Sequence, residues 1–214
     1  IDFWYIYFYN RKTHAIIPYD ESLRYLPSYL SQLFMESNGK STDLYGEKIN
    51  YNTGAIIWGE IGTNSQHSIG QLLHQGKHVV PIDFLAPLIE KGNQKHHELL
   101  LANCFAQSLT LMLGNNNKNS HLHLDGNKPS TTILYNELNP KTLGSLLAMY
   151  EHRVFAQGVL LEINSFDQHG VELSKRMALE ISENLQQKEI KINIDSSTKN
   201  LMAIYKESKK NSKN

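Results

Sequence analysis

The chain has 214 residues and 21 basic and 21 acidic side chains, so its formal net charge at pH 7 is zero. A neutral chain has no general electrostatic attraction to nucleic acid or to an anionic membrane, and we expect neither as a partner. The length suits one large domain, or one domain with an extension. The single cysteine, Cys104, excludes an internal disulfide framework and suits a reducing cytosol, so we expect a cytoplasmic protein in which Cys104 is a small buried side chain rather than a nucleophile.

Short runs rich in Ile, Val and aromatic residues predict strands at residues 2–9, 55–58, 79–84 and 131–135, with a further candidate at 159–163. These runs do not alternate strictly between apolar and polar residues, which is typical of a parallel sheet covered on both faces. The first run resembles a strand that needs neighbours on both sides. We therefore interpret the chain as the C-terminal part of a longer protein.

Apolar residues recur every three or four positions in several longer segments, which predicts helices at residues 21–34, 68–75, 97–112, 140–157, 171–185 and 198–208. Pro27 lies inside the first of these, and either begins a helix in its first turn or kinks it. Asn38 and Gly39 form a stop signal, because both tolerate a positive φ just past a helix. The alternation of strands and helices predicts an α/β fold, a three-layer αβα sandwich with a mostly parallel sheet, followed by C-terminal helices.

The lack of several motifs argues against a membrane span, a cofactor site and a metal site. No apolar run approaches the ~20 residues that span a bilayer, and no glycine-rich nucleotide loop occurs, so we expect no dinucleotide, ATP or other cofactor. Two histidine pairs, at residues 96–97 and at 121 and 123, could be metal ligands. Neither pair is followed by partners at the spacing of a known metal motif, so we predict no metal site.

Three segments place charged and amide side chains beside glycine in short, turn-prone stretches, where functional groups are often exposed. They are MESNGK at residues 35–40, WGEIGTNSQH at 58–67 and FDQHGVELSK at 166–175. In composition and order these segments resemble signatures of the glucose-6-phosphate isomerase (phosphoglucose isomerase) family, and the resemblance runs from residue 13 to residue 205. It implies a protein with two related sugar-isomerase (SIS-type) domains. This chain is similar to the second domain, which we assign to residues 1–165, and to a C-terminal helical segment with a polar tail, residues 166–214.

Glu36 lies in the last turn of a predicted helix, where the helix dipole disfavours a charged carboxylate, and this suits a proton acceptor. By itself a glutamate at a helix end is usually an ordinary solvated charge. The resemblance implies that Glu36 moves a proton between C1 and C2 of the sugar. Gln32 lies four residues earlier on the same helix face, and the resemblance implies that Gln32 contacts the substrate.

His67 follows a loop of glycine and small polar residues and is expected near a helix start, where unpaired amides favour a neutral imidazole. By itself such a histidine more often has no role. The resemblance implies that His67 assists opening of the sugar ring and reaches into the active site of the partner subunit. The chain departs from the family pattern at Ile61, where proline is usual, and at Ser65, where glycine is usual, so both backbone constraints differ here.

Lys175 is expected in the first two turns of a helix, where the dipole disfavours a cation. Without the motif it would be a solvated surface lysine. The resemblance implies that Lys175 acts at the ring oxygen during opening and that Gln168 hydrogen-bonds the substrate. His169 stands where tryptophan is usual, and we do not assign it a catalytic role.

Taken together, the resemblance implies an aldose-ketose isomerase of glycolysis and gluconeogenesis, active as a homodimer. It interconverts glucose 6-phosphate and fructose 6-phosphate through a cis-enediol. The arginine that stabilises the enediolate and the loop that binds phosphate would lie upstream of this chain, which is therefore expected to be inactive alone. Two alternatives remain open: a sugar-phosphate-binding SIS-type domain without turnover, and a segment that mainly provides dimer contacts.

Overall fold

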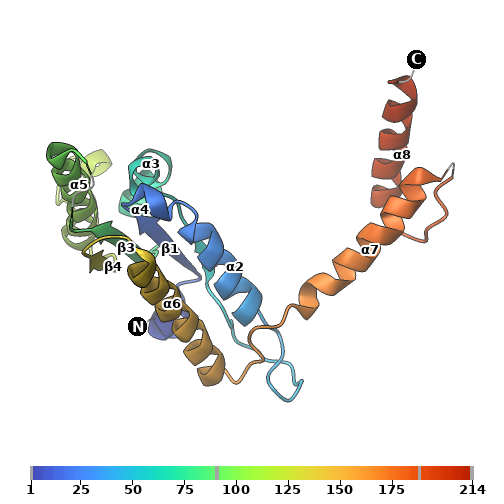
Figure 1. The fold of residues 1–214 in the computed structure, drawn as a ribbon, viewed down its shortest axis with the longest axis horizontal. Coiled ribbons are helices and arrows are strands. Elements are labelled where there is room, and N and C mark those ends of the chain that lie inside the picture. Colours follow the sequence, from blue (N-terminus) through green and yellow to red (C-terminus); the bar gives the residue numbers. More distant parts are fainter. Residues whose placement is uncertain (1, 90–91, 188, 213–214) are drawn as a thin grey trace. The chain divides into compact units, whose positions relative to one another are not determined.

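The computed structural model describes residues 2–89, 92–187 and 189–212. The chain forms two compact units, Ile1–Asp167 and Gln168–Asn214, and each is described by itself (Figure 1). Within the described residues no helix is both long and apolar enough to cross a membrane.

The first unit is built on a four-stranded sheet in the order β2-β1-β3-β4, and every neighbouring pair is parallel. The strands are β1 (Thr13–Pro18), β2 (Ile56–Trp58), β3 (Ile82–Pro87) and β4 (Ser130–Tyr135). The helices of this unit are α1 (Asp2–Tyr7), α2 (Leu26–Asn38), α3 (Gly62–Ser68), α4 (Gly70–Gln75), α5 (Gln94–Leu113) and α6 (Pro140–Leu160), with short 3-10 helices η1 (Glu21–Leu23) and η2 (Ser120–Leu122). The predicted α/β class with a parallel sheet is confirmed.

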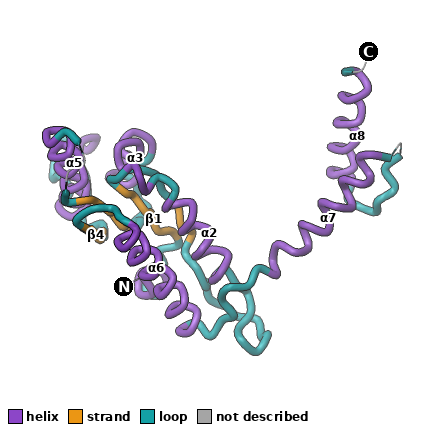
Figure 2. The backbone as a smooth tube through the Cα atoms, viewed as in Figure 1, coloured by secondary structure: helices purple, strands orange, loops and turns teal. Residues whose placement is uncertain are grey.

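Side chains of successive residues in the central strands enter two separate cores. Ile16 of β1 and Leu85 of β3 pack against α2 and α6, which supply apolar residues at every fourth position. The α2 and α6 residues in this core are Leu26, Leu30, Phe34, Leu146, Tyr150 and Val154. Ala15 and Ile17 of β1 point to the other face, where they meet Phe84 and residues of α4 and α5. Helices therefore cover both faces of the strands, which Figure 2 shows in orange between purple helices.

The strand predicted at residues 2–9 is wrong, because most of this segment forms α1. Its aromatic residues suggest a strand by composition, but they pair at helical spacing. The ring centroids of Phe3 and Tyr7 are 4.5 Å apart, as are those of Trp4 and Phe8. The strand candidate at 159–163 is also wrong, since α6 continues to Leu160 and a turn follows.

A cluster of polar side chains is buried between β1, β3 and α6. Asp83 is 3% exposed. Its carboxylate lies 2.8 Å from Arg153 Nη1 and 3.0 Å from His14 Nε2, and it accepts a hydrogen bond of 3.1 Å from the Tyr150 hydroxyl. Burial lowers the pKa of Arg153 to about 10, so the guanidinium remains charged at neutral pH. The buried carboxylate is therefore balanced by a cation from the helix that covers it.

We expect Arg153→Met to lower the free energy of unfolding by about 3–5 kcal/mol, because it leaves the Asp83 carboxylate buried without its cation. Urea denaturation of the protein measures this change. The matched control is Arg24→Met, which removes an exposed pair with Glu21 whose side chains are 51% and 62% exposed. That control should cost less than about 1 kcal/mol. Equal effects of the two substitutions would contradict the prediction.

The second unit consists of α7 (His169–Gln186) and α8 (Ser196–Asn211). Asp195 caps α8 by accepting a 2.9 Å hydrogen bond from Thr198 N. Lys206 Nζ donates to the carbonyl of Gln187 at 2.7 Å, which ties α8 to the end of α7. Both helices predicted in this part of the chain are confirmed, although each is longer than expected.

Candidate active site

Glu36 and Gln32 lie side by side on α2. Pro27 is in the first turn of this helix, so it begins the helix rather than kinking it. Gln32 Nε2 donates a 3.2 Å hydrogen bond to Glu36 Oε2, which confirms that the two side chains share a face. Gln32 is exposed and Glu36 is half-buried, so the carboxylate remains open to a ligand while an amide orients it.

Helix α2 ends at Asn38, as the Asn38–Gly39 stop signal predicts, but Gly39 does not adopt the positive φ on which that signal is based. Gly39 has φ −76°, so the expected positive φ is wrong. Its N–H donates to the Met35 carbonyl at 2.9 Å, and a Cβ atom at this position would collide with that carbonyl oxygen. Glycine is therefore needed for the close approach of the backbone to the last helical turn.

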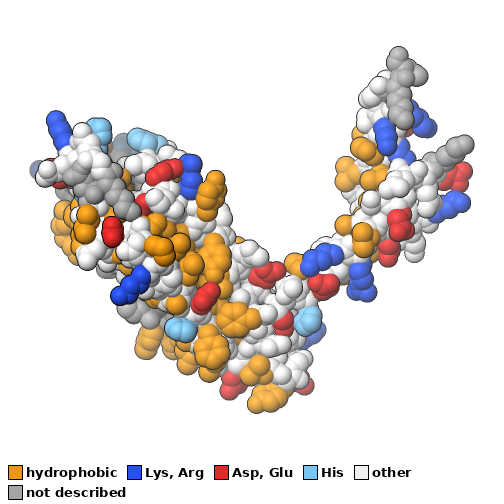
Figure 3. Space-filling view, viewed as in Figure 1, with side chains coloured by type: hydrophobic (Ala, Val, Ile, Leu, Met, Phe, Trp, Pro, Cys, Tyr) orange, Lys and Arg blue, Asp and Glu red, His pale blue; other side chains and the backbone are white. Residues whose placement is uncertain are grey.

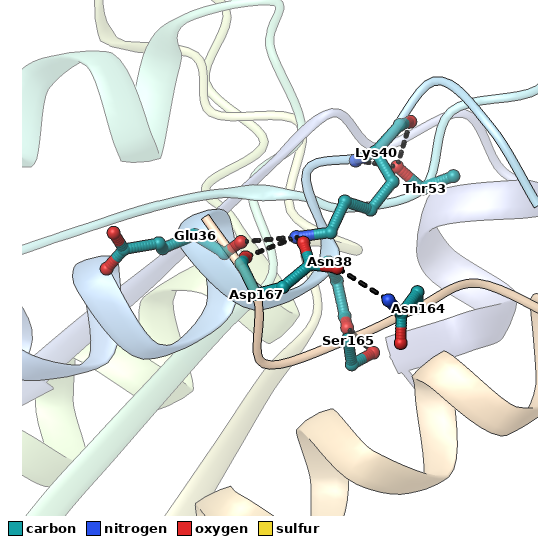
Figure 4. Close-up of polar contacts among 7 residues, drawn as sticks. All are labelled: Glu36, Asn38, Lys40, Thr53, Asn164, Ser165 and Asp167. Carbon is teal, nitrogen blue, oxygen red and sulfur yellow. Dashed lines mark hydrogen bonds and ion pairs between the residues drawn. The ribbon is translucent and has the colours of Figure 1, made fainter. Parts of the chain in front are cut away.

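Asn38, which ends α2, is fully buried and belongs to a polar network shown in Figure 4. Its Nδ2 donates to the Val154 carbonyl of α6 at 3.1 Å, and its Oδ1 accepts a 2.6 Å hydrogen bond from Ser165 Oγ. The sequence pattern indicates only a helix stop at Asn38. Its position inside the MESNGK segment was the one available signal of a further role.

His67 lies in the last turn of α3, so its expected position at a helix start is wrong. The helix predicted at residues 68–75 corresponds to α4, and α3 is an additional helix in the segment expected to be a loop. Ile61, which precedes α3, adopts φ −59°, close to the value that proline imposes. Ser65 is buried within α3 and donates from Oγ to the Gly62 carbonyl at 2.9 Å. The serine that departs from the family pattern therefore fits a helical turn here and does not need a positive φ.

The structure does not bring His67 and Glu36 together within the first unit. Glu36 lies in the last turn of α2, about 15 Å along the helix axis from Leu26, where the helix begins. His67 is on α3, which follows the carboxyl end of β2. Because β1 and β2 are parallel, α2 begins at the carboxyl end of β1 and returns to the amino end of β2, so α3 lies at the edge of the sheet where α2 begins. The two side chains therefore lie toward opposite ends of α2.

Lys175 and Gln168 belong to the second unit. Lys175 is the seventh residue of α7, and its Nζ lies 3.0 Å from Glu172 Oε1 in an exposed pair at helical spacing. Gln168 occupies the cap position before α7, and its carbonyl accepts a 3.1 Å hydrogen bond from Val171 N. Both side chains are exposed and available to a ligand.

A cavity of about 440 Å³ opens at the carboxyl ends of β1 and β3, the edge of a parallel sheet where ligands commonly bind. Polar side chains that line it include Asp20, Asn93 and His96. Asp20 accepts a 2.7 Å hydrogen bond from the Tyr135 hydroxyl. The sequence pattern gives no signal for Asp20, because the apolar run of β1 is too short to predict a strand that ends beside this residue.

Two further predictions concern Cys104 and the histidine pairs. Cys104 is fully buried, which confirms its assignment as a core side chain, and burial raises the pKa of its thiol to about 12. His123 Nε2 lies 3.2 Å from Asp125 Oδ1. Among the described residues, no group of three or more His, Cys, Asp or Glu side chains is arranged to hold a metal ion.

The fold and these residues define an α/β protein with a parallel sheet, a half-buried helix-end carboxylate and an adjacent amide. Residues 1–202 match the phosphoglucose isomerase family, and the chain belongs to this family. It is 50% identical to glucose-6-phosphate isomerase 1 of Chromohalobacter salexigens over 97% of this chain and 38% of that protein. It is 47% identical to the glucose-6-phosphate isomerase of Chlorobium luteolum over 95% of this chain and 40% of that protein.

A solved structure agrees with this assignment. The crystal structure of a glucose-6-phosphate isomerase from Chlamydia trachomatis superposes with a TM-score of 0.83 at 37% identity, covering 95% of this chain and 40% of the other. The chain thus spans about two fifths of the length of these relatives.

Proposed function

We propose that this chain is part of a glucose-6-phosphate isomerase, an enzyme that interconverts glucose 6-phosphate and fructose 6-phosphate in glycolysis and gluconeogenesis. The observation that carries the proposal is 50% identity, along 97% of the chain, to a protein of that name. The proposed enzyme is a cytoplasmic homodimer that shares its active sites between subunits and needs no cofactor.

The proposed reaction begins with opening of the sugar ring. His67 and Lys175 assist this step, Lys175 at the ring oxygen. The Glu36 carboxylate then removes the proton from C2, which gives a cis-enediol, and returns that proton to C1. Gln32 and Gln168 hydrogen-bond the substrate. The hydrogen bond between Gln32 and Glu36 supports this assignment, because an amide beside the carboxylate can hold it in one orientation.

The negative charge of the enediolate needs preorganised donors, and the substrate phosphate needs a binding loop. We assign both to parts of the protein outside these 214 residues. The incomplete coverage of the relatives supports this assignment, since about three fifths of each relative lies outside the matched region.

The test is the conversion of fructose 6-phosphate by the complete protein, followed by coupled oxidation of the glucose 6-phosphate formed. We expect a kcat within the usual enzymatic range of about 1–10³ s⁻¹. Binding of fructose 6-phosphate without turnover would instead identify a sugar-phosphate-binding SIS-type protein and overturn the proposed enzyme.

We expect that His67 acts in the active site of the partner subunit. The placement of His67 and Glu36 toward opposite ends of α2 supports this prediction. A complete-protein Glu36→Gln variant mixed with a His67→Ala variant should then regain roughly a quarter of wild-type activity, because half of the closed dimers are mixed and each has one intact site.

The measurement is the isomerase rate after subunit exchange, which mass spectrometry of differently tagged subunits can verify. Each variant exchanged with itself provides the control. Verified exchange without recovery of activity would place His67 in its own subunit's site or remove it from the reaction.

A further inference from the structure

Lys40 connects two of the three signature segments, although its partners are far apart in sequence. Its Nζ donates to the Glu36 carbonyl at 2.8 Å and to the Asp167 carbonyl at 2.7 Å, 127 positions away, and it lies 3.0 Å from Asp167 Oδ1. An ammonium group has three N–H donors. The ammonium therefore makes two hydrogen bonds to main-chain carbonyls and one ion pair with a carboxylate (Figure 4).

The surroundings fix Lys40 and Asp167 in place. The Lys40 side chain is 15% exposed and that of Asp167 is 23% exposed. The Thr53 hydroxyl binds both main-chain polar groups of Lys40, since Thr53 Oγ1 accepts from Lys40 N at 2.9 Å and donates to Lys40 O at 2.8 Å. The second oxygen of Asp167 accepts a 2.6 Å hydrogen bond from Asn164 Nδ2. The ion pair is therefore largely shielded from water and held on both sides.

The backbone between these contacts is strained. Phe166 has φ +65°, a left-handed conformation that is rare for a bulky residue, and its side chain is 55% exposed. Surrounding contacts must impose such a conformation. They come from the end of α2, where Asn38 binds Ser165 on one side of Phe166 and Lys40 binds Asp167 on the other. The end of α2 thus sets the path of the chain immediately before Gln168.

We propose that Lys40 is a positioning residue for the isomerase reaction, which orients Glu36 by holding the last turn of α2 against residues 165–167. This inference rests on the proposed function. Figure 4 shows the Glu36 carboxylate directed away from Lys40, whose ammonium contacts the Glu36 main-chain oxygen instead. Lys40 therefore acts through the backbone that carries Glu36, and not as a charge beside the reacting carboxylate.

Removing the ammonium takes one partner from the Glu36 carbonyl and one from the Asp167 carboxylate, so the last turn of α2 loses this anchor and keeps the contacts of Asn38. A carboxylate that is misplaced by about 1 Å can cost about 10²-fold in rate. Substrate binding through other groups is largely retained. The expected signature is therefore a loss in kcat with little change in KM.

The test compares Lys40→Met with Lys48→Met in the complete protein, with fructose 6-phosphate as substrate. Lys48 is an exposed lysine in the loop that follows the signature, so its replacement controls for loss of one surface charge. Lys40→Met should lower kcat by about 10–100-fold and leave KM within about threefold. Lys48→Met should leave both parameters unchanged. A Lys40→Met variant with the kinetics of Lys48→Met would overturn the inference.

A second comparison separates positioning from a general structural role. In a Glu36→Gln background, adding Lys40→Met should leave the residual rate within about twofold, because effects of residues that act as a unit do not add. A further tenfold loss would show that Lys40 acts independently of Glu36 and would overturn the inference.

If Lys40→Met does not fold, Asp167→Asn decides the question, since it keeps the size of the side chain and removes its charge. A severalfold loss of kcat with an unchanged unfolding midpoint supports the inference, and unchanged kcat contradicts it. The proposed function fails separately, if the wild-type protein itself does not convert fructose 6-phosphate.

Discussion

Replacing Glu36 with glutamine in the complete protein is expected to lower kcat for isomerisation by about 10²–10⁴-fold or more, because the amide cannot accept the C2 proton. The substitution preserves the size of the side chain, and its amide oxygen can still accept the hydrogen bond from Gln32. Fold and substrate binding should therefore be retained. The measurements are the coupled isomerase rate and calorimetric binding of fructose 6-phosphate.

The matched control is Glu47→Gln, an exposed glutamate in the loop after α2. It makes the same chemical change away from the candidate site and should leave kcat unchanged. A Glu36→Gln variant that stays within about tenfold of wild type would remove Glu36 from the role of base.

The second large effect concerns residues 1–214 expressed alone, which we expect to be soluble and catalytically inactive. The two cores of the sheet are sufficient for folding. The donors that stabilise the enediolate and the loop that binds the phosphate are assigned to parts of the protein outside this chain. Loss of a single oxyanion-type donor costs about 10²–10³-fold, and loss of phosphate binding removes energy that lowers the barrier at the reacting carbons.

The coupled assay with fructose 6-phosphate measures this directly, with the complete protein as the positive control. Circular dichroism of residues 1–214 confirms that an inactive sample is folded. Turnover at an ordinary enzymatic rate would show that the chain carries a complete active site.

Residues 1–214 alone are also expected to self-associate. Figure 3 shows apolar side chains gathered on the visible face of the first unit. Trp4 and Phe8 of the N-terminal segment are 58% and 64% exposed, and Phe105 and Met112 of α5 are 43% and 59% exposed. Exposed apolar surface of this kind favours association. Analytical ultracentrifugation should show a mass that rises with concentration, and a constant monomer mass would contradict this expectation.

Sequence patterns predicted the architecture where a segment is long or strongly apolar. The helical period located α5, α6, α7 and α8, and β-branched runs located β2, β3 and β4. Strand β1 was missed although it is central, because its apolar run is only three residues long, between His14 and Pro18. That histidine is accommodated by Asp83 from the neighbouring strand, a long-range contact that local pattern cannot reveal.

In the candidate site too, local sequence patterns predicted some features, and others depend on contacts between distant residues. The spacing of Gln32 and Glu36 on one helix face follows from local geometry, and the structure confirms their contact. The position of His67 depended on whether the segment before the predicted helix is a loop, and that segment instead forms α3, whose last turn holds His67. The ion pair between Lys40 and Asp167 joins residues 127 positions apart, so no pattern within either segment could predict it.

The buried cluster of His14, Asp83, Tyr150 and Arg153 has a consequence for how this protein can change over evolutionary time. Its members come from β1, β3 and α6, so the cluster holds α6 in one register over the sheet. A single replacement leaves a desolvated charge without its counterpart, whereas simultaneous replacement of Asp83 and Arg153 by apolar side chains removes both charges. Substitutions at these positions should therefore be inherited together, and a lineage that has lost the aspartate should have lost the arginine as well.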